Sequence, residues 1–167
     1  SDVPEQLERL TDLLGRTTGW RYINIDDELE TYDADGKLLR IRNRAGVEQV
    51  LSYNAAGQLI QVADDAGRTL TFEYDPATAQ LARMTDPQNR SYVYEYSEYG
   101  SLVKVIYPGQ TSRQYHYETE GRGSLLTGIT DERNVRYVSW KYDYQNRAIE
   151  SVYAGGADRF TFEFGDK

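Results

Sequence analysis

A short motif recurs along the chain at a nearly constant interval. The segment YDADGKLLRI, residues 32–41, is followed by YNAAGQLIQV, residues 53–62. Alignment on the first residue of this motif gives successive intervals of 21, 21, 22, 21, 25 and 22 residues. The aligned residues are Tyr32, Tyr53, Tyr74, Tyr96, Tyr117, Tyr142 and, less closely, Phe164. Self-similarity at a fixed period indicates a repeat architecture in which each unit stacks on the next.

Each repeat contains a turn between two short runs of strand-forming residues. Asp, Asn or Ser opens the turn and Gly or Asn closes it, as in DADG (33–36), NAAG (54–57) and SEYG (97–100). These residues suit a type I turn followed by one left-handed residue. A second turn follows the next aliphatic run, so each unit is expected to be strand, turn, strand, turn. The fifth turn, ETEGRG (118–123), is longer and absorbs the 25-residue interval.

The strand after each second turn alternates between apolar and polar residues. Tyr92, Tyr94 and Tyr96 share one parity, whereas Ser91 and Glu95 have the other. A period of two is typical of a strand with one buried and one solvated face. We therefore expect the aromatic residues to be largely buried and the polar ones to face water. In particular, we expect Tyr94, Trp140 and Phe162 to be largely buried, and Glu73, Glu95 and Lys141 to face water.

The composition agrees with an ordered β protein. The chain has fifteen Tyr and only four Pro among 167 residues, which is too aromatic for a disordered segment. A lone hairpin is marginal in water, so the units must stack to share an apolar face. The sequence predicts an all-β fold of antiparallel hairpins in one long curved sheet over residues 20–167. This region holds about six clear repeats and one degenerate unit at 20–31, with Asp26 and Asp27 at its turn.

Residues 1–19 are expected to form a short N-terminal α-helix and a linker. Asp2 and Glu5 have the spacing of a capping box, and Gly15 can end the helix. Pro4 suits the first helical turn. Leu7, Leu10 and Leu14 would share one face, with which the helix would cap the first hairpins.

Bulk properties exclude several classes of function. The net charge of −8 would repel a phosphate backbone, so no nucleic-acid partner is expected. The chain has no cysteine, which excludes disulfides and thiolate metal sites. No apolar run approaches the roughly 18 residues of a membrane span, and the sequence starts at Ser1 without a basic, apolar signal segment. Both ends look like cuts in a longer protein.

No residue set predicts catalysis, cofactor binding or a metal site, so the chain is not expected to be an enzyme. His116 lies on the polar parity of a strand and is expected to be a solvated strand residue. DADG begins like a calcium loop, but the twelfth position from Asp33 is Arg44, where a bidentate Glu is required. The pairs Asp26–Asp27 and Asp64–Asp65 lie in predicted turns, where Asp is favoured because its side chain accepts hydrogen bonds from the turn backbone. Adjacent carboxylates do not suit a glycosidase, whose two acids are about 5 to 10 Å apart across a cleft.

The spacing and the Tyr-Asp, Gly-x-Leu pattern resemble the YD or Rhs repeats of bacterial Rhs polymorphic toxins, toxin-complex C subunits and teneurins. SLVKVIYPGQTSRQYHYE (101–118), LTGITDERNVRY (126–137) and YDYQNRAIES (142–151) carry the resemblance furthest, and it covers roughly residues 20–164. The residues expected to define the repeats are Tyr32, Gly36, Leu38, Tyr53, Gly57, Leu59, Tyr74, Leu81, Tyr96, Gly100, Leu102, Tyr117, Leu126 and Tyr142.

The resemblance implies a function as well as a fold. In that family the repeats form one spiralling sheet that closes into a hollow cocoon around a C-terminal toxin. No segment of this sequence matches the family's self-cleavage region, so the resemblance implies a section of a structural shell without protease or toxin activity. The implied partners are the rest of the shell and the enclosed toxin polypeptide, and the implied location of the parent protein is secreted or at the bacterial cell surface.

The aromatic parity leaves a second function open. Ordered Tyr, Trp and Phe side chains also suit a carbohydrate-binding or adhesive surface module, with a glycan as its partner. The unpaired strands at the two ends of the sheet predict that the isolated chain self-associates. The alternative to self-association is a strip that curls tightly enough to bury its own apolar face.

Overall fold

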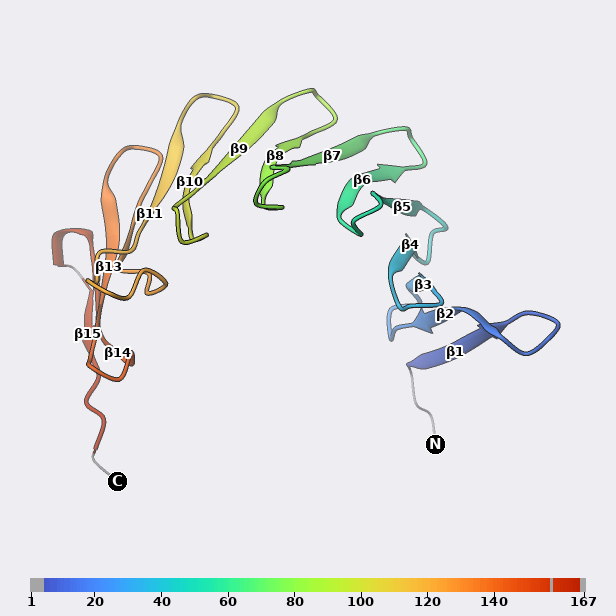
Figure 1. The fold of residues 1–167 in the computed structure, drawn as a ribbon, viewed down its shortest axis with the longest axis horizontal. Coiled ribbons are helices and arrows are strands. Elements are labelled where there is room, and N and C mark those ends of the chain that lie inside the picture. Colours follow the sequence, from blue (N-terminus) through green and yellow to red (C-terminus); the bar gives the residue numbers. More distant parts are fainter. Residues whose placement is uncertain (1–4, 157, 166–167) are drawn as a thin grey trace. The chain divides into compact units, whose positions relative to one another are not determined.

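The computed structural model describes residues 5–156 and 158–165, which form fifteen β-strands and one short 3-10 turn, Ala154–Gly156. The strands follow one another in a single sheet in chain order, so the predicted all-β fold of antiparallel hairpins is confirmed (Figure 1). β1 and β15 are its edge strands. The strands are β1 (Gln6–Thr11), β2 (Thr17–Ile23), β3 (Leu29–Asp33), β4 (Leu38–Arg42), β5 (Glu48–Tyr53), β6 (Leu59–Asp64), β7 (Thr69–Tyr74), β8 (Leu81–Thr85), β9 (Ser91–Tyr96), β10 (Leu102–Ile106), β11 (Ser112–His116), β12 (Gly128–Thr130), β13 (Arg136–Tyr142), β14 (Ala148–Tyr153) and β15 (Arg159–Thr161).

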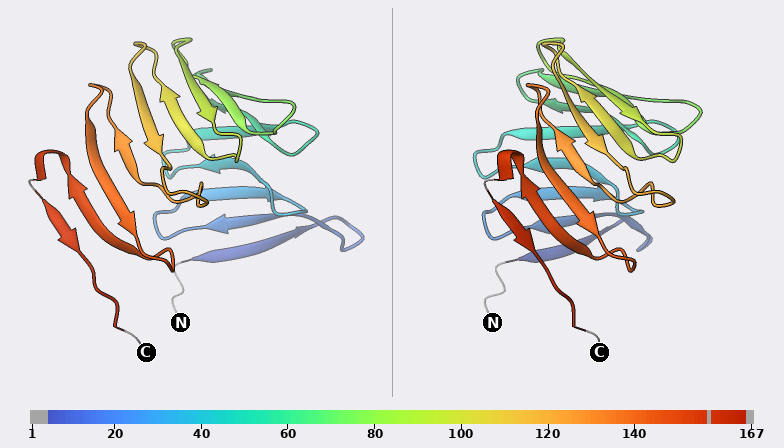
Figure 2. Two further views of the ribbon diagram at one scale, coloured as in Figure 1. Left: turned by 60° about the vertical axis from the view of Figure 1, so that its left-hand side comes forward. Right: turned by 90° about the vertical axis from the view of Figure 1, so that its left-hand side faces the viewer.

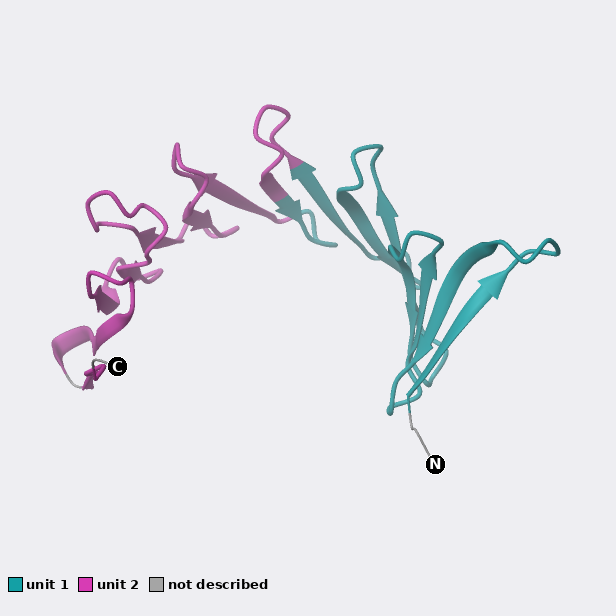
Figure 3. Ribbon diagram, turned by 60° about the horizontal axis from the view of Figure 1, so that its bottom comes forward, with its two compact units in different colours: residues 1–73, 84–89 teal, residues 74–83, 90–167 magenta. Residues whose placement is uncertain are grey.

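The chain divides into two compact units, coloured separately in Figure 3. Unit 1 comprises residues 1–73 and 84–89, and unit 2 comprises residues 74–83 and 90–167. Within unit 1 the pairings run without interruption from β1 to β7, and within unit 2 they run from β9 to β15. Figure 2 shows the hairpins from two further sides. Each strand therefore meets only its neighbours in sequence, as a stacked repeat requires.

The predicted turns are confirmed, and their hydrogen bonds explain the repeated letters. Asp33 Oδ1 accepts the backbone N–H groups of Asp35 at 3.0 Å and Lys37 at 2.8 Å. The N–H of Gly36 donates to the carbonyl of Asp33 at 3.2 Å, and Gly36 has a φ of 85°. A residue with a side-chain Cβ is strained at that φ, which explains the closing glycine. Asn54, Asp64, Asp131 and Asp143 accept the same pair of backbone bonds.

The predicted N-terminal helix is wrong for every described residue of that segment. Residues 6–11 are β1, which pairs antiparallel with β2. Asp12 and Gly15 form another turn of the repeated type: Asp12 Oδ1 accepts two backbone N–H groups, and Gly15 has a φ of 76°. Asp12 and Gly15 precede Asp33 and Gly36 by one 21-residue period, so this hairpin is a further repeat. The helix was predicted because Leu7, Leu10 and Leu14 have helical spacing. Asp2 and Pro4, on which its expected start depended, lie outside the described residues.

The sheet buries little apolar surface. Among the described residues only two hydrophobic residues are buried: Val105 is 7% exposed and Val138 is 3% exposed. Tyr94 and Trp140 are only half-buried, although they lie on the predicted apolar parity. Within the described chain, the apolar side chains are therefore mostly half-buried or exposed.

Candidate functional site: the two faces of the sheet

In unit 2 the strand register separates aromatic from polar side chains. Tyr94 lies opposite Val105, and Tyr115 lies opposite Ile129, which in turn lies opposite Val138. Cross-strand partners lie on the same face of a sheet. We call this side of unit 2 the aromatic face. Its aromatic and aliphatic members include Tyr92, Tyr94, Tyr96, Val105, Tyr115, Ile129, Val138, Trp140, Tyr142 and Phe160, and the register places the polar residues Arg113 and Ser151 among them.

The opposite side of unit 2, the polar face, carries several charged side chains, some of which form ion pairs. His116 lies opposite Gly128, which lies opposite Ser139. Lys141 lies opposite Glu150, and its Nζ is 2.8 Å from Glu150 Oε1. Arg159 on β15 forms a second ion pair with Glu150. The exposure of Glu73, Glu95 and Lys141 agrees with the predicted wet parity.

Unit 1 shows the same separation over its own strands. Trp20 lies opposite Tyr32, and Leu51 lies opposite Val62, which lies opposite Leu70. On the other side, Arg40 and Glu48 are joined by an ion pair at 2.9 Å. Both units therefore have one mainly apolar and one mainly polar face, although in unit 1 Glu30 lies on the apolar side and Val50 lies opposite Arg40.

Phe162 was expected to be buried, and this expectation is wrong. Phe160, Phe162 and Phe164 are 56%, 51% and 47% exposed. They belong to the terminal segment of the described sheet, where β15 has a hydrogen-bonded neighbour on one side only. The ring of Phe164 is covered in part by the guanidinium of Arg147, which lies 4.4 Å from the ring centroid.

The structure places the proposed repeat-defining residues around the hairpin turns. Within a hairpin the leading tyrosine and the leucine are cross-strand partners, as shown by the pairs Tyr32–Leu38, Tyr53–Leu59 and Tyr96–Leu102. The glycines lie in the turns with positive φ. Tyr74 and Tyr142 end β7 and β13, and Leu81 begins β8. Tyr117 directly follows β11, and Leu126 lies shortly before β12. The φ angles of Gly36, Gly57 and Gly100 are 85°, 80° and 82°.

Tyrosine hydroxyls also link one repeat to the repeat before it. The hydroxyl of Tyr53 donates to the backbone carbonyl of Leu38 at 2.7 Å. The hydroxyl of Tyr142 donates to the carbonyl of Leu126 at 2.8 Å. In both cases the acceptor is the leucine of the preceding hairpin, so the Tyr and Leu of the motif connect neighbouring repeats. Sequence alignment alone gave no reason for a hydroxyl at this position.

We expect Tyr142→Phe to lower the free energy of unfolding by about 1 kcal/mol, because it removes this hydrogen bond while it keeps the ring. Tyr144→Phe is the matched control, since Tyr144 is 75% exposed in the adjoining turn. Urea unfolding followed by tyrosine and tryptophan fluorescence measures both variants. An equal change in the two variants would show that the hydroxyl link does not stabilise the sheet.

A polar network that sequence reasoning missed joins the long fifth loop to β13. Arg136 donates to the two carboxylate oxygens of Glu118 at 2.8 and 2.7 Å. Glu118 also accepts the hydroxyl of Thr127 at 3.0 Å. Gly128 leaves room for this arrangement, because a Cβ at that position would lie 2.4 Å from the Arg136 guanidinium. Glu118 and Arg136 are 18 residues apart, so no local pattern pointed to the pair.

The network changes the acidity of its carboxylate. The hydrogen bonds from Arg136 lower the pKa of Glu118 to about 2, and the Thr127 hydroxyl contributes in the same direction. The Arg133 side chain likewise lowers the pKa of Asp131, and Lys141 and Arg159 lower that of Glu150. Each of these groups stabilises the folded chain as a carboxylate, above its unfolded pKa of about 4.

We therefore expect the urea midpoint to fall as the pH decreases from about 5 to 2, because the lowered folded-state pKa values mean that the unfolded chain binds protons first. Glu118→Gln should make this decline shallower, whereas Glu120→Gln in the same exposed loop should leave it unchanged. Midpoints measured at several pH values between 7 and 2 test the expectation. A midpoint that stays constant or rises on acidification would contradict it.

The other titratable residues that the sequence analysis considered take part in turns or in cross-strand contacts. His116 lies on the polar face as the parity predicted, but it is half-buried and its Nε2 is 2.7 Å from Thr130 Oγ1. Asp33 takes part in a hairpin turn, and Asp27 has a φ of 59° in the turn expected for the degenerate unit. Among residues 5–156 and 158–165, no group of three or more His, Cys, Asp or Glu could hold a metal ion. The same residues contain no helix with the length and hydropathy needed to cross a membrane.

Comparisons with known proteins give one family and a set of similar folds. The sequence model of the family described as the teneurin YD-shell matches residues 10–167. No curated protein matches the chain.

Among solved structures, the crystal structure of TcdB2-TccC3-Cdc42 aligns with 93% of this chain at a TM-score of 0.57 and 15% identity. The crystal structure of TcdB2-TccC3 gives the same TM-score at 16% identity. A Photorhabdus luminescens Tc holotoxin pore with a TccC3 variant aligns equally well, at 15% identity. This chain covers only 9% to 10% of those chains, and at these identities the similarity shows the fold.

Proposed function

Because the chain belongs to the teneurin YD-shell family, we propose that it is a wall segment of a larger β-repeat shell that encloses a toxin polypeptide. The shell would shield the toxin until delivery into another bacterial cell. The rest of the shell and the enclosed polypeptide are then its partners, and the parent protein is secreted or displayed at the cell surface. The segment itself acts as a non-enzymatic structural element.

The observation that supports this proposal most is the difference between the two faces of the sheet in unit 2, one charged and the other aromatic. The polar face of unit 2 carries charged side chains that suit contact with water, and several of them form ion pairs, as in Lys141–Glu150–Arg159. The aromatic face has large side chains that are only half-buried, with no second layer over them in the described part of unit 2. A wall with water on one side and polypeptide on the other requires this arrangement.

The proposal predicts which face is enclosed. Ser151 lies on the aromatic face between Trp140 and Phe160, whereas Thr161 lies on the polar face opposite Glu150. The chain has no native cysteine, so Ser151→Cys and Thr161→Cys each introduce a single thiol into this segment. We expect a bulky maleimide to label both variants in the isolated chain.

In the full-length gene product the two thiols should differ. Labelling at position 151 is expected to slow at least tenfold relative to the isolated chain, while labelling at position 161 stays fast. Labelling by a small thiol reagent under denaturing conditions confirms that both cysteines are intact. Equal labelling rates at the two positions in the full-length protein would refute the enclosed aromatic face.

A further inference from the structure

The long fifth connection builds a cavity that the regular repeats do not require. Residues 117–127 join β11 to β12, and together with the turn at 97–101 they surround a cavity of about 650 Å³. This volume is in the range of sites for small molecules. Insertions in a repeat array often map to its binding face. The connection is therefore a candidate binding site.

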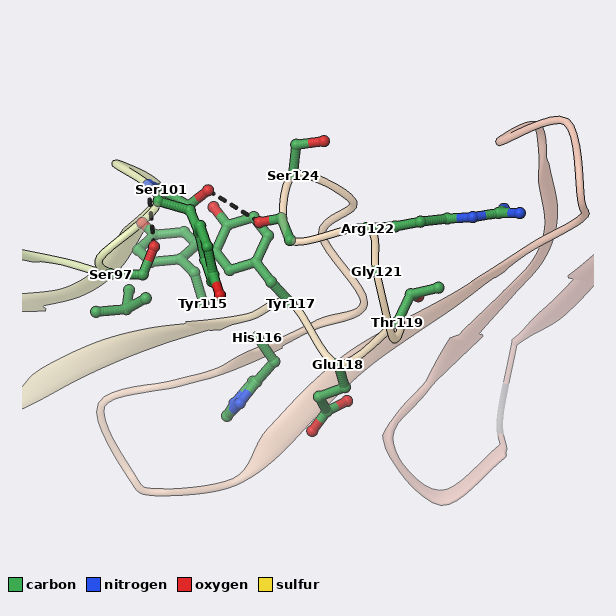
Figure 4. Close-up of a pocket in the computed structure, with 13 residues that line it drawn as sticks. Ser97, Ser101, Tyr115, His116, Tyr117, Glu118, Thr119, Gly121, Arg122 and Ser124 are labelled. Atoms are coloured by element: carbon green, nitrogen blue, oxygen red, sulfur yellow. Dashed lines mark hydrogen bonds between the residues drawn. The ribbon is translucent and has the colours of Figure 1, made fainter.

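Aromatic rings form part of the cavity wall. Tyr115 and Tyr117 point to the side on which Ser101 and Ser124 lie (Figure 4). Tyr99 belongs to the turn at 97–101 and is 78% exposed. A Cβ at Gly123 would lie 3.4 Å from the Tyr99 ring, so the ring and the loop backbone are close together. The Ser101 hydroxyl donates to the carbonyl of Gly123 at 3.0 Å and ties the two rims to each other.

The charged lining residues already have other partners. Arg122 donates to the backbone carbonyls of Asp143 at 2.7 Å and Tyr144 at 3.0 Å, in the next turn. Glu118 is held by Arg136, and the side chains of His116 and Glu118 point away from Tyr115 and Tyr117 (Figure 4). The cavity thus offers rings and neutral hydroxyls, including those of Ser97, Ser124 and Thr119. An anionic ligand would lack the cation it needs.

From this chemistry we propose that the cavity binds a neutral saccharide of one or two sugar rings. A sugar has an apolar C–H face that packs on a tyrosine ring, and its hydroxyls exchange hydrogen bonds with serine and threonine. The cavity shares Tyr115 with the aromatic face, but sugar binding is measured on the isolated chain and does not depend on the enclosure of that face. Its failure and the failure of the shell proposal are therefore separate results.

The test uses the 167-residue chain with maltose, cellobiose, lactose and chitobiose as probes. Saturation-transfer NMR detects contact with each sugar, and calorimetric titration gives the affinity. At least one sugar is expected to bind with a dissociation constant between about 10 µM and 1 mM, as suits a ligand of this size. If no probe binds to the wild-type chain at concentrations tenfold above this range, the proposal is overturned.

Two tyrosine variants locate the binding. Tyr99→Ala is expected to weaken binding at least tenfold, and Tyr99→Trp should restore it because it returns an aromatic surface. Tyr144→Ala is the matched control, since Tyr144 is 75% exposed in the next turn and does not line the cavity. Binding that survives Tyr99→Ala, or that is lost equally in the Tyr144→Ala variant, overturns the proposal. Circular dichroism confirms that each variant keeps its β spectrum.

Discussion

The isolated chain is expected to form dimers or larger assemblies, with a mass at least twice the 19.2 kDa of one chain. The sheet has two edge strands, β1 and β15, whose outer sides have no hydrogen-bonded strand among the described residues. Unpaired strand edges pair readily with another chain. Leu7 on β1 is 69% exposed and Phe162 beside β15 is 51% exposed, so each edge also presents apolar side chains.

Size-exclusion chromatography with light scattering over a hundredfold concentration range measures this assembly. The double variant Leu7→Lys, Phe162→Lys should shift the mass toward a monomer, because charges on an edge oppose strand pairing. Leu13→Lys is the control, since Leu13 is fully exposed in a turn and lies outside the edge strands. A wild-type mass near that of one chain at every concentration would refute self-association.

Truncation of one of the few buried side chains should have the largest effect on stability. Val138 is 3% exposed on β13, where Ile129 and Tyr153 are its cross-strand partners. Val138→Ala is expected to lower the free energy of unfolding by about 2 to 3 kcal/mol, because two buried methyl groups are lost and a cavity remains. With so little buried apolar surface, the neighbours have few other contacts to compensate.

Val135→Ala provides the matched comparison, since the same atoms are removed from a turn residue that is 43% exposed. Its expected cost is about 0.5 kcal/mol or less. Urea unfolding of both variants gives the difference. Equal losses of stability would mean that Val138 is no better packed than an exposed valine, which would contradict its burial in the sheet.

The turns and strands could be predicted because their causes are local. The side chain of Asp33 bonds to backbone groups two and four residues ahead, and Gly36 adopts its left-handed φ within the same turn. The alternation at Tyr92, Tyr94 and Tyr96 likewise follows from strand geometry alone. Period, turn chemistry and parity thus determined the all-β repeat from sequence.

The N-terminal segment shows where local signals competed. Leu7, Leu10 and Leu14 have helical spacing, but Asp12 and Gly15 have the spacing of a repeat turn. Pairing with β2 decides between them, because it satisfies the backbone of residues 6–11 in the same sheet as every other repeat. Short isolated helices are marginal in water, so the tertiary pairing prevails.

The candidate sites depend on contacts that no sequence period records. The Glu118–Arg136 pair, the tyrosine hydroxyl links and the cavity beside Tyr99 each join residues from different hairpins. Phe162 belongs to the same apolar alternation pattern as Tyr94. It is nevertheless exposed, because the described sheet has no further strand beyond β15. The sequence by itself determined which side of each strand is apolar, since that depends on alternation within the strand. Only the tertiary structure decided how far each side chain is covered and which charges are paired, because both depend on the neighbouring strands and loops.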